Sequence, residues 1–433
     1  MRKVHLPLLV LSFTAAPRLG AQVRAVTLQQ AIQLSERIQP GMVQARGDVE
    51  TAAAQRRSAW GSFLPSVNAS SSASDFFSEG QATVDPVTQQ VISGNRSSRS
   101  VSAGLSASLD LFTGFRRGAD LKAARAAQDA AGASLVDARF QQALTTTNQF
   151  FDALAAAQLV GVRDASVRRA EEQLKVSVAK LHAGSATRSD SLRSLVTLGT
   201  ARLDLIQAQT DLASAEAGLA RFIGERGRVV AADDSAFYQV LPPVDTAAIR
   251  AEALARSPRV QEATANSEAA RANLRASRAS YWPSLNLSAS TNWNGTRSSD
   301  YALFNQRQLS LGLRWTLFNG FDRELTVAQR SASLDVAEAS AADAARQVDA
   351  ELTAQLAALD AARTKIDITQ TSVAAATEDL RVLQERYRLG VATIVDVLTS
   401  QEALNQAEVD VVVARFDYLR AKAQLEALIG RTL

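Results

Sequence analysis

The sequence contains no cysteine among its 433 residues, so disulfide bridges and thiolate metal sites are excluded. Histidine is nearly absent as well, because only His5 and His182 occur. No Ser/His/Asp set, glycine-rich phosphate loop or cluster with metal-ligand spacing is present. No stretch beyond the N-terminal segment approaches 18 uninterrupted apolar residues, the minimum for a transmembrane helix. We therefore expect no enzyme activity, no cofactor, no bound metal and no membrane-spanning helix.

Residues 1–21 have the layout of a secretory signal peptide. Arg2 and Lys3 precede an apolar run from Leu6 to Phe13, and small residues follow as far as Ala21. Cleavage near Ala21 would reduce the formal net charge from +3 to about 0, so the basic pI does not indicate a nucleic-acid partner. With no cysteine near the cleavage site, a lipid anchor is also excluded. We expect an exported protein.

The remaining chain is duplicated. The stretch "LFTGFRRGADLKAARAA" begins at Leu111, and "LFNGFDRELTVAQRSAS" begins at Leu317, 206 residues later. The same offset continues without a gap to Gly224 and Gly430, and upstream it becomes 218 because the first copy has about 12 additional residues, placed around 79–94. A repeat of this length indicates two copies of one structural unit, at 22–224 and 246–433, joined by a linker at 225–245.

Each copy is expected to contain a helix, two strands, a very long helix and a further helix. Strict alternation, such as Leu309, Leu311 and Leu313 against polar or small neighbours, predicts β-hairpins at about 64–112 and 284–318. Heptad spacing from Leu352 to Tyr387, with looser spacing in the first copy, predicts long supercoiled helices. The expected long helices are 116–182 and 322–388, followed by 188–223 and 393–429. A 67-residue helix is roughly 100 Å long, more than a globular core requires.

Strands of about 10 residues with one apolar and one polar face suit a membrane β-barrel. A soluble sandwich has the same alternation, but aromatic residues favour the barrel because they gather in or beside the strands, as in an interfacial girdle. These residues are Trp60, Phe63, Phe112, Phe115, Tyr281, Trp282, Trp293, Trp315, Phe318 and Phe321. One chain supplies only four strands, and eight would make a barrel filled by its own side chains. A conducting pore therefore needs three or more copies.

Over essentially the whole mature chain, the pattern resembles the TolC-like outer-membrane channel family. The matching features are the duplication, the "LFTGF" and "LFNGF" strand-to-helix junctions, and the helix turns "KLHAGSATRSDSL" and "RYRLGVATIVDVLTSQ". The resemblance implies a mainly α protein with a membrane β-barrel: a homotrimer with a 12-stranded barrel in the outer membrane, continued by an α-helical tunnel in the periplasm. It also implies two protein partners, a periplasmic adaptor and an inner-membrane pump, in addition to outer-membrane lipid.

At the junctions, Gly114 and Gly320 would permit the change of backbone direction between strand and helix, beside Phe112 and Phe318. At the far end of the tunnel, Gly184 and Gly390 are expected to end the long helices. The turns around them, including Leu389 and Val391, are expected to contact the adaptor.

The resemblance also places a gate at this end, where acidic residues face the lumen. Asp396 matches the family position, so three copies would form a ring of carboxylates that attracts cations. The second acidic position of the family is Thr399 here, and an arginine sometimes found after the turn is Ala392. Tyr387 is expected to help hold the tip closed, with Asp190 as its partner. Asp190 and Asp396 also have the Thr-x-x-Asp spacing of a capping box, so capping is an alternative or additional role.

We therefore expect the outer-membrane channel of a tripartite efflux system, a passive exit duct for small toxic compounds that projects into the periplasm. One alternative is the outlet of a type I protein secretion system. A second is a periplasmic coiled-coil adaptor or structural protein that forms no channel.

Overall fold

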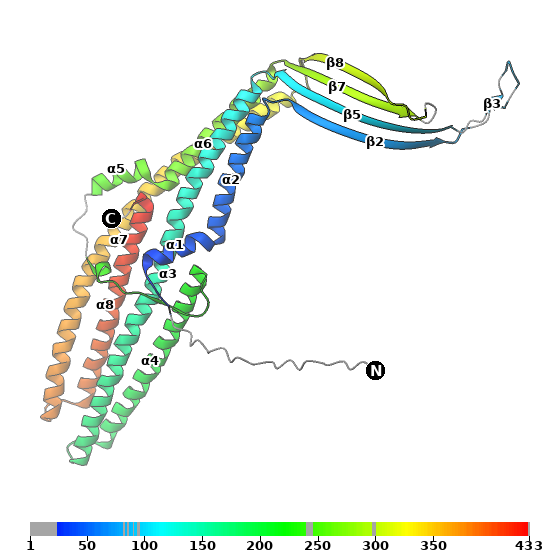
Figure 1. Ribbon diagram of the computed structural model, residues 1–433. Coiled ribbons are helices and arrows are strands. Elements are labelled where there is room, and N and C mark those ends of the chain that lie inside the picture. The colour runs from blue at the N-terminus through cyan, green and yellow to red at the C-terminus, as the bar shows by residue number, and fades with distance from the viewer. Residues whose placement is uncertain are drawn as a thin grey trace, which may run out of the picture. The chain divides into compact units, whose positions relative to one another are not determined.

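The computed structural model describes residues 24–80, 83–84, 86–89, 91–92, 96–239, 246–296 and 300–431. The expected signal peptide lies outside the described residues, as do part of the 79–94 segment and the end of the linker. The chain forms two compact units, whose elements are labelled in Figure 1. We call them the strand unit, with described residues from 40–142, 246–358 and 422–431, and the helical unit, with 24–39, 143–239 and 359–421.

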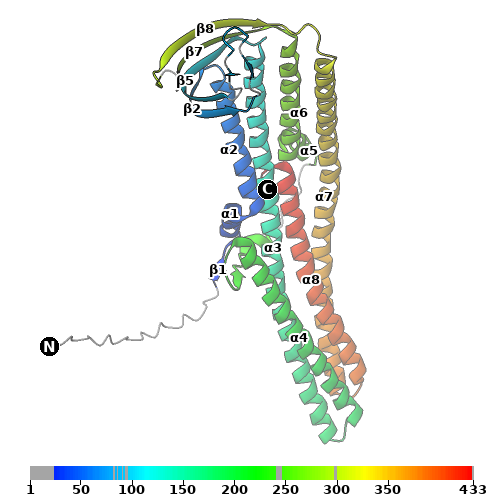
Figure 2. The ribbon, with the colours of Figure 1, turned by 90° about the vertical axis from the view of Figure 1, so that its right-hand side faces the viewer.

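The strand unit contains an antiparallel sheet of four strands in the order β2-β5-β7-β8. The strands lie side by side in Figures 1 and 2 and comprise β2 (Ser66–Ser78), β5 (Arg96–Phe112), β7 (Ser284–Thr296) and β8 (Phe304–Arg314). The central β5–β7 pairing joins the two sequence repeats. A separate pair of short strands, β3 (Thr83–Val84) and β4 (Val91–Ile92), lies within the additional residues of the first repeat.

The register of the sheet keeps polar and apolar residues on opposite faces across all four strands. Ser70, Gly104, Asn292 and Gln306 form one row of directly opposed residues, and the adjacent rows on that face are also polar or small except at Phe304 in β8. Leu109, Leu287 and Leu311 form a row on the other face. Because side chains alternate with a period of two, this register makes one largely polar face and one largely apolar face.

The second hairpin is shorter than the alternation predicts. Alternating residues continue through Trp315 to Leu317, yet β8 ends at Arg314. Arg314 pairs with Ser284, the first residue of β7, and the residue before it is Pro283. Proline has no N–H to donate to a ladder, so Trp315 has no strand partner, and the strand ends.

Upstream of each hairpin, the structure has two helices where one was expected. They are α1 (Leu28–Ile38) and α2 (Pro40–Gly61) in the first repeat, and α5 (Thr246–Arg256) and α6 (Pro258–Ser277), extended by η2 (Arg278–Tyr281), in the second. Proline disfavours the helical region for the residue before it. Gln39 (ψ 131°) and Ser257 (ψ 126°) are accordingly extended, and each pair of helices is broken there.

The longest helices have the bounds expected from the heptads and glycines: α3 (Arg116–His182), α4 (Arg188–Ile223) and α7 (Asp322–Arg388). The last helix, α8 (Ile394–Ile429), begins one residue later than expected. In the helical unit, parts of these four helices run side by side (Figures 1 and 2). Phe150, Phe151, Phe416 and Phe237 pack edge-on or tilted in its core, with ring centroids 5.7–6.2 Å apart. None of the helices in the described ranges is long and apolar enough to cross a bilayer.

The linker is more ordered than its lack of periodicity suggested. β6 (Val229–Ala231) pairs in parallel with β1 (Arg24–Val26), and η1 (Ser235–Tyr238) follows. Val26 and Val229 are fully buried or nearly so, which ties the linker to the start of the described chain.

Candidate functional site: the tip of the helical unit

The tip comprises the ends of α3 and α7, the starts of α4 and α8, and the turns between them. Both long helices stop at a glycine in the left-handed conformation, Gly184 (φ 71°) and Gly390 (φ 81°). Each turn closes with a long-range backbone bond: Ser185 N–H donates to Lys180 O (2.8 Å), and Val391 N–H donates to Arg386 O (2.9 Å). This is the glycine-dependent C-terminal motif expected from the sequence, and it reverses the chain in a few residues.

Both expected aspartates form the capping boxes of the next helices. The Asp190 carboxylate accepts from Thr187 N–H (2.9 Å), and Asp396 accepts from Thr393 N–H (2.8 Å) and from its hydroxyl (2.7 Å). In return, each threonine hydroxyl accepts from the aspartate N–H (3.3 Å). The hydrogen bonds from Thr393 lower the pKa of Asp396 below its ordinary value. Asp396 is therefore a fixed negative charge at neutral pH.

The exposed side of the tip carries the other expected residues. Asp396 and Thr399 are three residues apart, on one side of α8, and both are exposed. Leu389 and Val391 are exposed at the turn, at 78% and 62%. A cavity of about 870 Å³ lies between the first turns of α4 and α8, lined by Leu192, Val196, Val395, Leu398 and Thr399 among others. The tip thus exposes both charged and apolar side chains.

Tyr387 is buried rather than exposed, with Leu380, Ile394 and Val397 in its cluster. Its hydroxyl has no hydrogen-bond partner among the described residues. Burial raises the pKa of Tyr387, the nearby Ser177 hydroxyl offsets part of this, and the negative charge of Asp190 adds a smaller increase. Tyr387 and Asp190 thus interact electrostatically within one chain, and their pairing in a closed tip stays a prediction.

Lys180 links α3 to α7 at the tip and was not expected from the sequence. Its ammonium donates to the carbonyl oxygens of Tyr387 (2.7 Å) and Arg388 (3.1 Å) and lies 4.9 Å from the centroid of the Tyr387 ring. A cation at a helix C-terminus satisfies carbonyls that have no partner within the helix. Lys180 thereby supplies a basic contact between the α3–α4 and α7–α8 helical hairpins.

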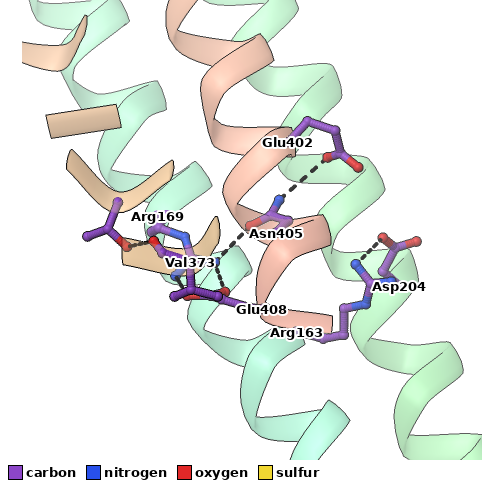
Figure 3. A network of polar contacts seen from close by, with 8 residues as sticks. Arg163, Arg169, Asp204, Val373, Glu402, Asn405 and Glu408 are labelled. Atoms are coloured by element: carbon purple, nitrogen blue, oxygen red, sulfur yellow. Dashed lines mark hydrogen bonds and ion pairs between the residues drawn. The ribbon is translucent and has the colours of Figure 1, made fainter. Parts of the chain in front are cut away.

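A second unexpected link lies farther along α3, where Arg169 contacts α8 (Figure 3). Its guanidinium forms a bidentate ion pair with Glu408 (2.5 and 3.0 Å) and donates to Asn405 (2.7 Å). Asn405 in turn donates to Glu402 (3.5 Å). Arg420 of α8 also pairs with Asp152 of α3, through a single contact of 2.6 Å. Bidentate pairing fixes both distance and orientation, so these residues hold the α3–α4 hairpin against the α7–α8 hairpin.

The expected junction residues lie in the strand unit. Gly114 (φ 63°) and Gly320 (φ 69°) are left-handed, and each is followed by a phenylalanine that is also left-handed, Phe115 (φ 67°) or Phe321 (φ 65°). Phe112 packs edge-on against Phe115 at 5.2 Å, and Phe318 packs against Phe321 at 5.3 Å. Two consecutive left-handed residues redirect the chain sharply from strand to helix. The same device occurs in both repeats.

These elements together define a channel component: an amphipathic sheet with two free edges among the described strands, very long helices and a helical tip. The model of the outer membrane efflux protein family matches residues 29–225 and 249–431. The chain belongs to this family. It is a channel protein of the outer membrane and not an enzyme.

Individual relatives are similar at low identity but over long spans. The chain is 25% identical over 325 residues to the outer membrane efflux protein BepC of Brucella suis, covering 73% of this chain and 71% of that protein. It is 27% identical over 349 residues to the pyoverdine export outer membrane protein OpmQ of Pseudomonas aeruginosa, covering 78% and 71%. Its fold is similar to the crystal structure of the outer membrane protein VceC from Vibrio cholerae, with a TM-score of 0.75, 17% identity and coverage of 94% and 96%.

Proposed function

We propose that three copies of this chain close into a 12-stranded barrel and form the exit duct of a tripartite efflux system for small compounds. The observation that carries the proposal is the sheet. β2 and β8 are its edges, and within the described residues neither edge strand has a second partner in the sheet. An open edge cannot be left in lipid, so the edges must pair with other copies.

The order of the strands permits this pairing. Adjacent strands are antiparallel, and four strands place β2 and β8 in opposite directions, so β8 of one copy can continue antiparallel onto β2 of the next. The polar face, with the row from Ser70 to Gln306, would then line a water-filled lumen. The apolar face, with Leu109, Leu287 and Leu311, would contact lipid.

In the helical unit, the tip would provide the gate and the docking surface. Three copies would bring three Asp396 carboxylates together at the constriction, which would select for cations. The exposed turn residues Leu389 and Val391, with their counterparts beside Gly184, would contact a periplasmic adaptor, through which an inner-membrane pump delivers substrate. Opening would separate the α7–α8 hairpin from the α3–α4 hairpin, against the contacts of Lys180 and Arg169.

The absence of native cysteine allows a direct test of barrel closure. Cysteine at Ser70 in β2, combined in turn with cysteine at Gln306, Gln308 or Ser310 in β8, should form disulfides between copies in outer-membrane fractions. Denaturing gels without reductant should then show species of one, two and three chains. The single-cysteine variants are the controls. A product of one chain only, or a ladder that continues beyond three, would contradict the proposed trimer.

The substrate class needs a separate assay. In a host that lacks its own exit channel, co-expression of this chain with an efflux adaptor and pump should restore resistance to small toxic compounds. Restoration of protein secretion with a type I exporter, without restored resistance, would favour the secretion alternative. Recovery of the protein from the periplasm without detergent would favour the non-channel alternative.

A further inference from the structure

The first strand-to-helix junction contains a cavity of about 550 Å³ that combines aromatic and basic side chains. All of its lining residues belong to the strand unit. Phe63, Phe112 and Phe115 supply aromatic surface, while Arg117, Lys122 and Arg275 supply positive charge. Such a combination at the end of a membrane sheet is suited to an amphipathic anion.

The aromatic side of the cavity continues the apolar face of the sheet. The β5–β7 register shifts between Asp110 and Phe112, so that Phe112 lies opposite Leu285, which itself pairs with Leu313 on the apolar face. A bulge of this kind re-aims one side chain to the other face. Phe115, which is 66% exposed, extends the surface by packing edge-on against Phe112. The apolar face therefore reaches past the end of the strand and into the cavity.

The basic side of the cavity has no internal counter-charge. Arg117 donates to the carbonyl oxygens of Ser62 (3.1 Å) and Asp110, and its guanidinium lies 5.2 Å from the centroid of the Phe63 ring. These contacts orient Arg117 without neutralising it. In the described ranges, neither Arg117 nor Lys122 nor Arg275 forms an ion pair with a carboxylate.

The nearest acidic side chains in the sequence are engaged elsewhere. The carboxylate of Asp120 lies 3.9 Å from Arg116. The Asp110 carboxylate accepts from Asn286 (2.9 Å), on the polar side of the sheet. The three cations of the cavity are thus left for an external anion.

The second junction provides an internal comparison. Arg323 occupies the position of Arg117 and makes the equivalent contacts, to the Thr316 carbonyl oxygen (3.2 Å) and 4.2 Å from the centroid of the Tyr281 ring. However, Arg323 also pairs with Glu324 at 3.0 Å. The first repeat has Gly118 in place of Glu324, and the second has Ala328 in place of Lys122. The fold of the junction therefore does not require the unpaired charges of the first repeat.

From this we infer that the cavity at the first junction binds an anionic phospholipid of the periplasmic leaflet of the outer membrane. The phosphate would contact Arg117, Lys122 and Arg275, and an acyl chain would lie along Phe112 and Phe115. Guanidinium and ammonium groups pair strongly with phosphate oxygens, and basic residues at a membrane surface favour anionic lipid by about 1 kcal/mol each. The site would fix the depth of each subunit in the bilayer.

The full-length channel, purified in detergent, can be titrated with phosphatidylglycerol and followed by native mass spectrometry. The double variant Lys122→Gln/Arg275→Gln should weaken phosphatidylglycerol binding about 25-fold, because each cation removed should cost about fivefold in affinity. Binding of phosphatidylcholine should change little. The matched control is Arg139→Gln with Arg330→Gln, which removes two exposed cations of α3 and α7 from outside the cavity. The same spectra show whether each variant keeps the oligomeric state of the parent.

Three results would overturn the inference. The first is a cavity variant that retains its affinity for phosphatidylglycerol, and the second is a control variant that loses affinity equally. The third is displacement of the lipid by glycerol 3-phosphate at the same concentration, which would assign the site to a soluble phosphate. Because lipid binding is measured without transport, its loss or survival is independent of the substrate assay above.

Discussion

Replacing Arg169 with glutamine would remove the bidentate ion pair between α3 and α8 while keeping a polar side chain of similar length. Arg169 and Glu408 are only 22% and 23% exposed as side chains, and Asn405 accepts a further bond from Arg169. The variant leaves the Glu408 carboxylate partly buried without its cation. The closed arrangement of the two hairpins should be destabilised relative to any arrangement in which Glu408 reaches water.

The size of the effect follows from the burial of the pair. Exposed ion pairs contribute about 0.2–1 kcal/mol, whereas removing one member of a fully buried pair costs about 3–5 kcal/mol. A pair that is about three-quarters buried lies between these limits, so we expect about 2 kcal/mol. Since about 1.4 kcal/mol corresponds to a tenfold change in an equilibrium constant, the ratio of open to closed channels should rise about 30-fold.

Planar-bilayer recordings of the reconstituted channel measure this ratio directly. Arg169→Gln should spend more time in the high-conductance state, and Glu408→Gln should act in the same direction. Combining the two variants should give less than the sum of their effects, because both remove the same contact.

The matched control is Arg202→Gln. Arg202 pairs with Glu171 at 2.8 Å and joins α3 to α4 within one hairpin, so it should leave the open fraction unchanged. If Arg169→Gln has the same open fraction as the parent while the oligomer stays intact, the Arg169–Glu408 contact does not hold the channel closed. Equal activation by Arg202→Gln would show that any lost surface pair loosens the helices, and the argument for a specific link would fail.

Two further expectations concern the constriction and the junctions. Asp396→Ala should reduce block by divalent cations in planar bilayers. In the parent, the block should persist to acidic pH, because Thr393 lowers the pKa of Asp396, and it should weaken as the carboxylates become protonated. The stabilisation that Asp396 gives to α8 as part of its capping box depends on pH in the same direction. It is present above the pKa of Asp396 in the unfolded chain and is lost as the pH falls through its pKa in the folded chain. Gly114→Ala should destabilise the chain by about 2–4 kcal/mol and so reduce the yield of protease-resistant protein, since a Cβ there would lie 2.6 Å from Trp282. Gly320→Ala should cost the single chain only about 1 kcal/mol of backbone strain and mainly reduce oligomer yield on gels. Unchanged block in Asp396→Ala, or equal loss of folded chain in both glycine variants, would contradict these expectations.

The periodicity of apolar residues in the sequence was sufficient to predict the long helices and the strands. The heptad from Leu352 to Tyr387 predicted α7, and residues at its repeat positions, including Leu359 and Ile366, are buried. Alternation predicted which residues share a face of the sheet, because a period of two leaves no freedom once the register is set. The break at Pro40 was also readable in principle, since the residue before a proline rarely continues a helix.

Contacts between helices were not readable in the same way. The spacing of Arg169 and Lys180 shows that they lie on a long helix, but not which neighbour each one faces. The neighbour that each residue faces depends on how the paired helices are rotated and offset along their axes. Many of the contact positions are alanines, whose small side chains fix neither the rotation nor the offset strongly. Tyr387 illustrates the consequence. Its position near the turn was evident, whereas its burial beside Lys180, without a partner for its hydroxyl, depends on packing.

The two repeats are equivalent in backbone but not in surroundings. A Cβ added at Gly114 would meet Trp282 and Ala279 of the second repeat, whereas one added at Gly320 would have no heavy atom of the described chain within 4 Å. By the 218-residue offset, the counterparts of Trp282 and Ala279 are Leu64 and Gly61, at the end of α2. In a closed ring, the end of α2 and the residues after it in a second copy would occupy the open space beside Gly320, just as η2 and Trp282 occupy the space beside Gly114. The asymmetry of a single chain is thus what a cyclic assembly requires, because one junction is completed within the chain and the other only between copies.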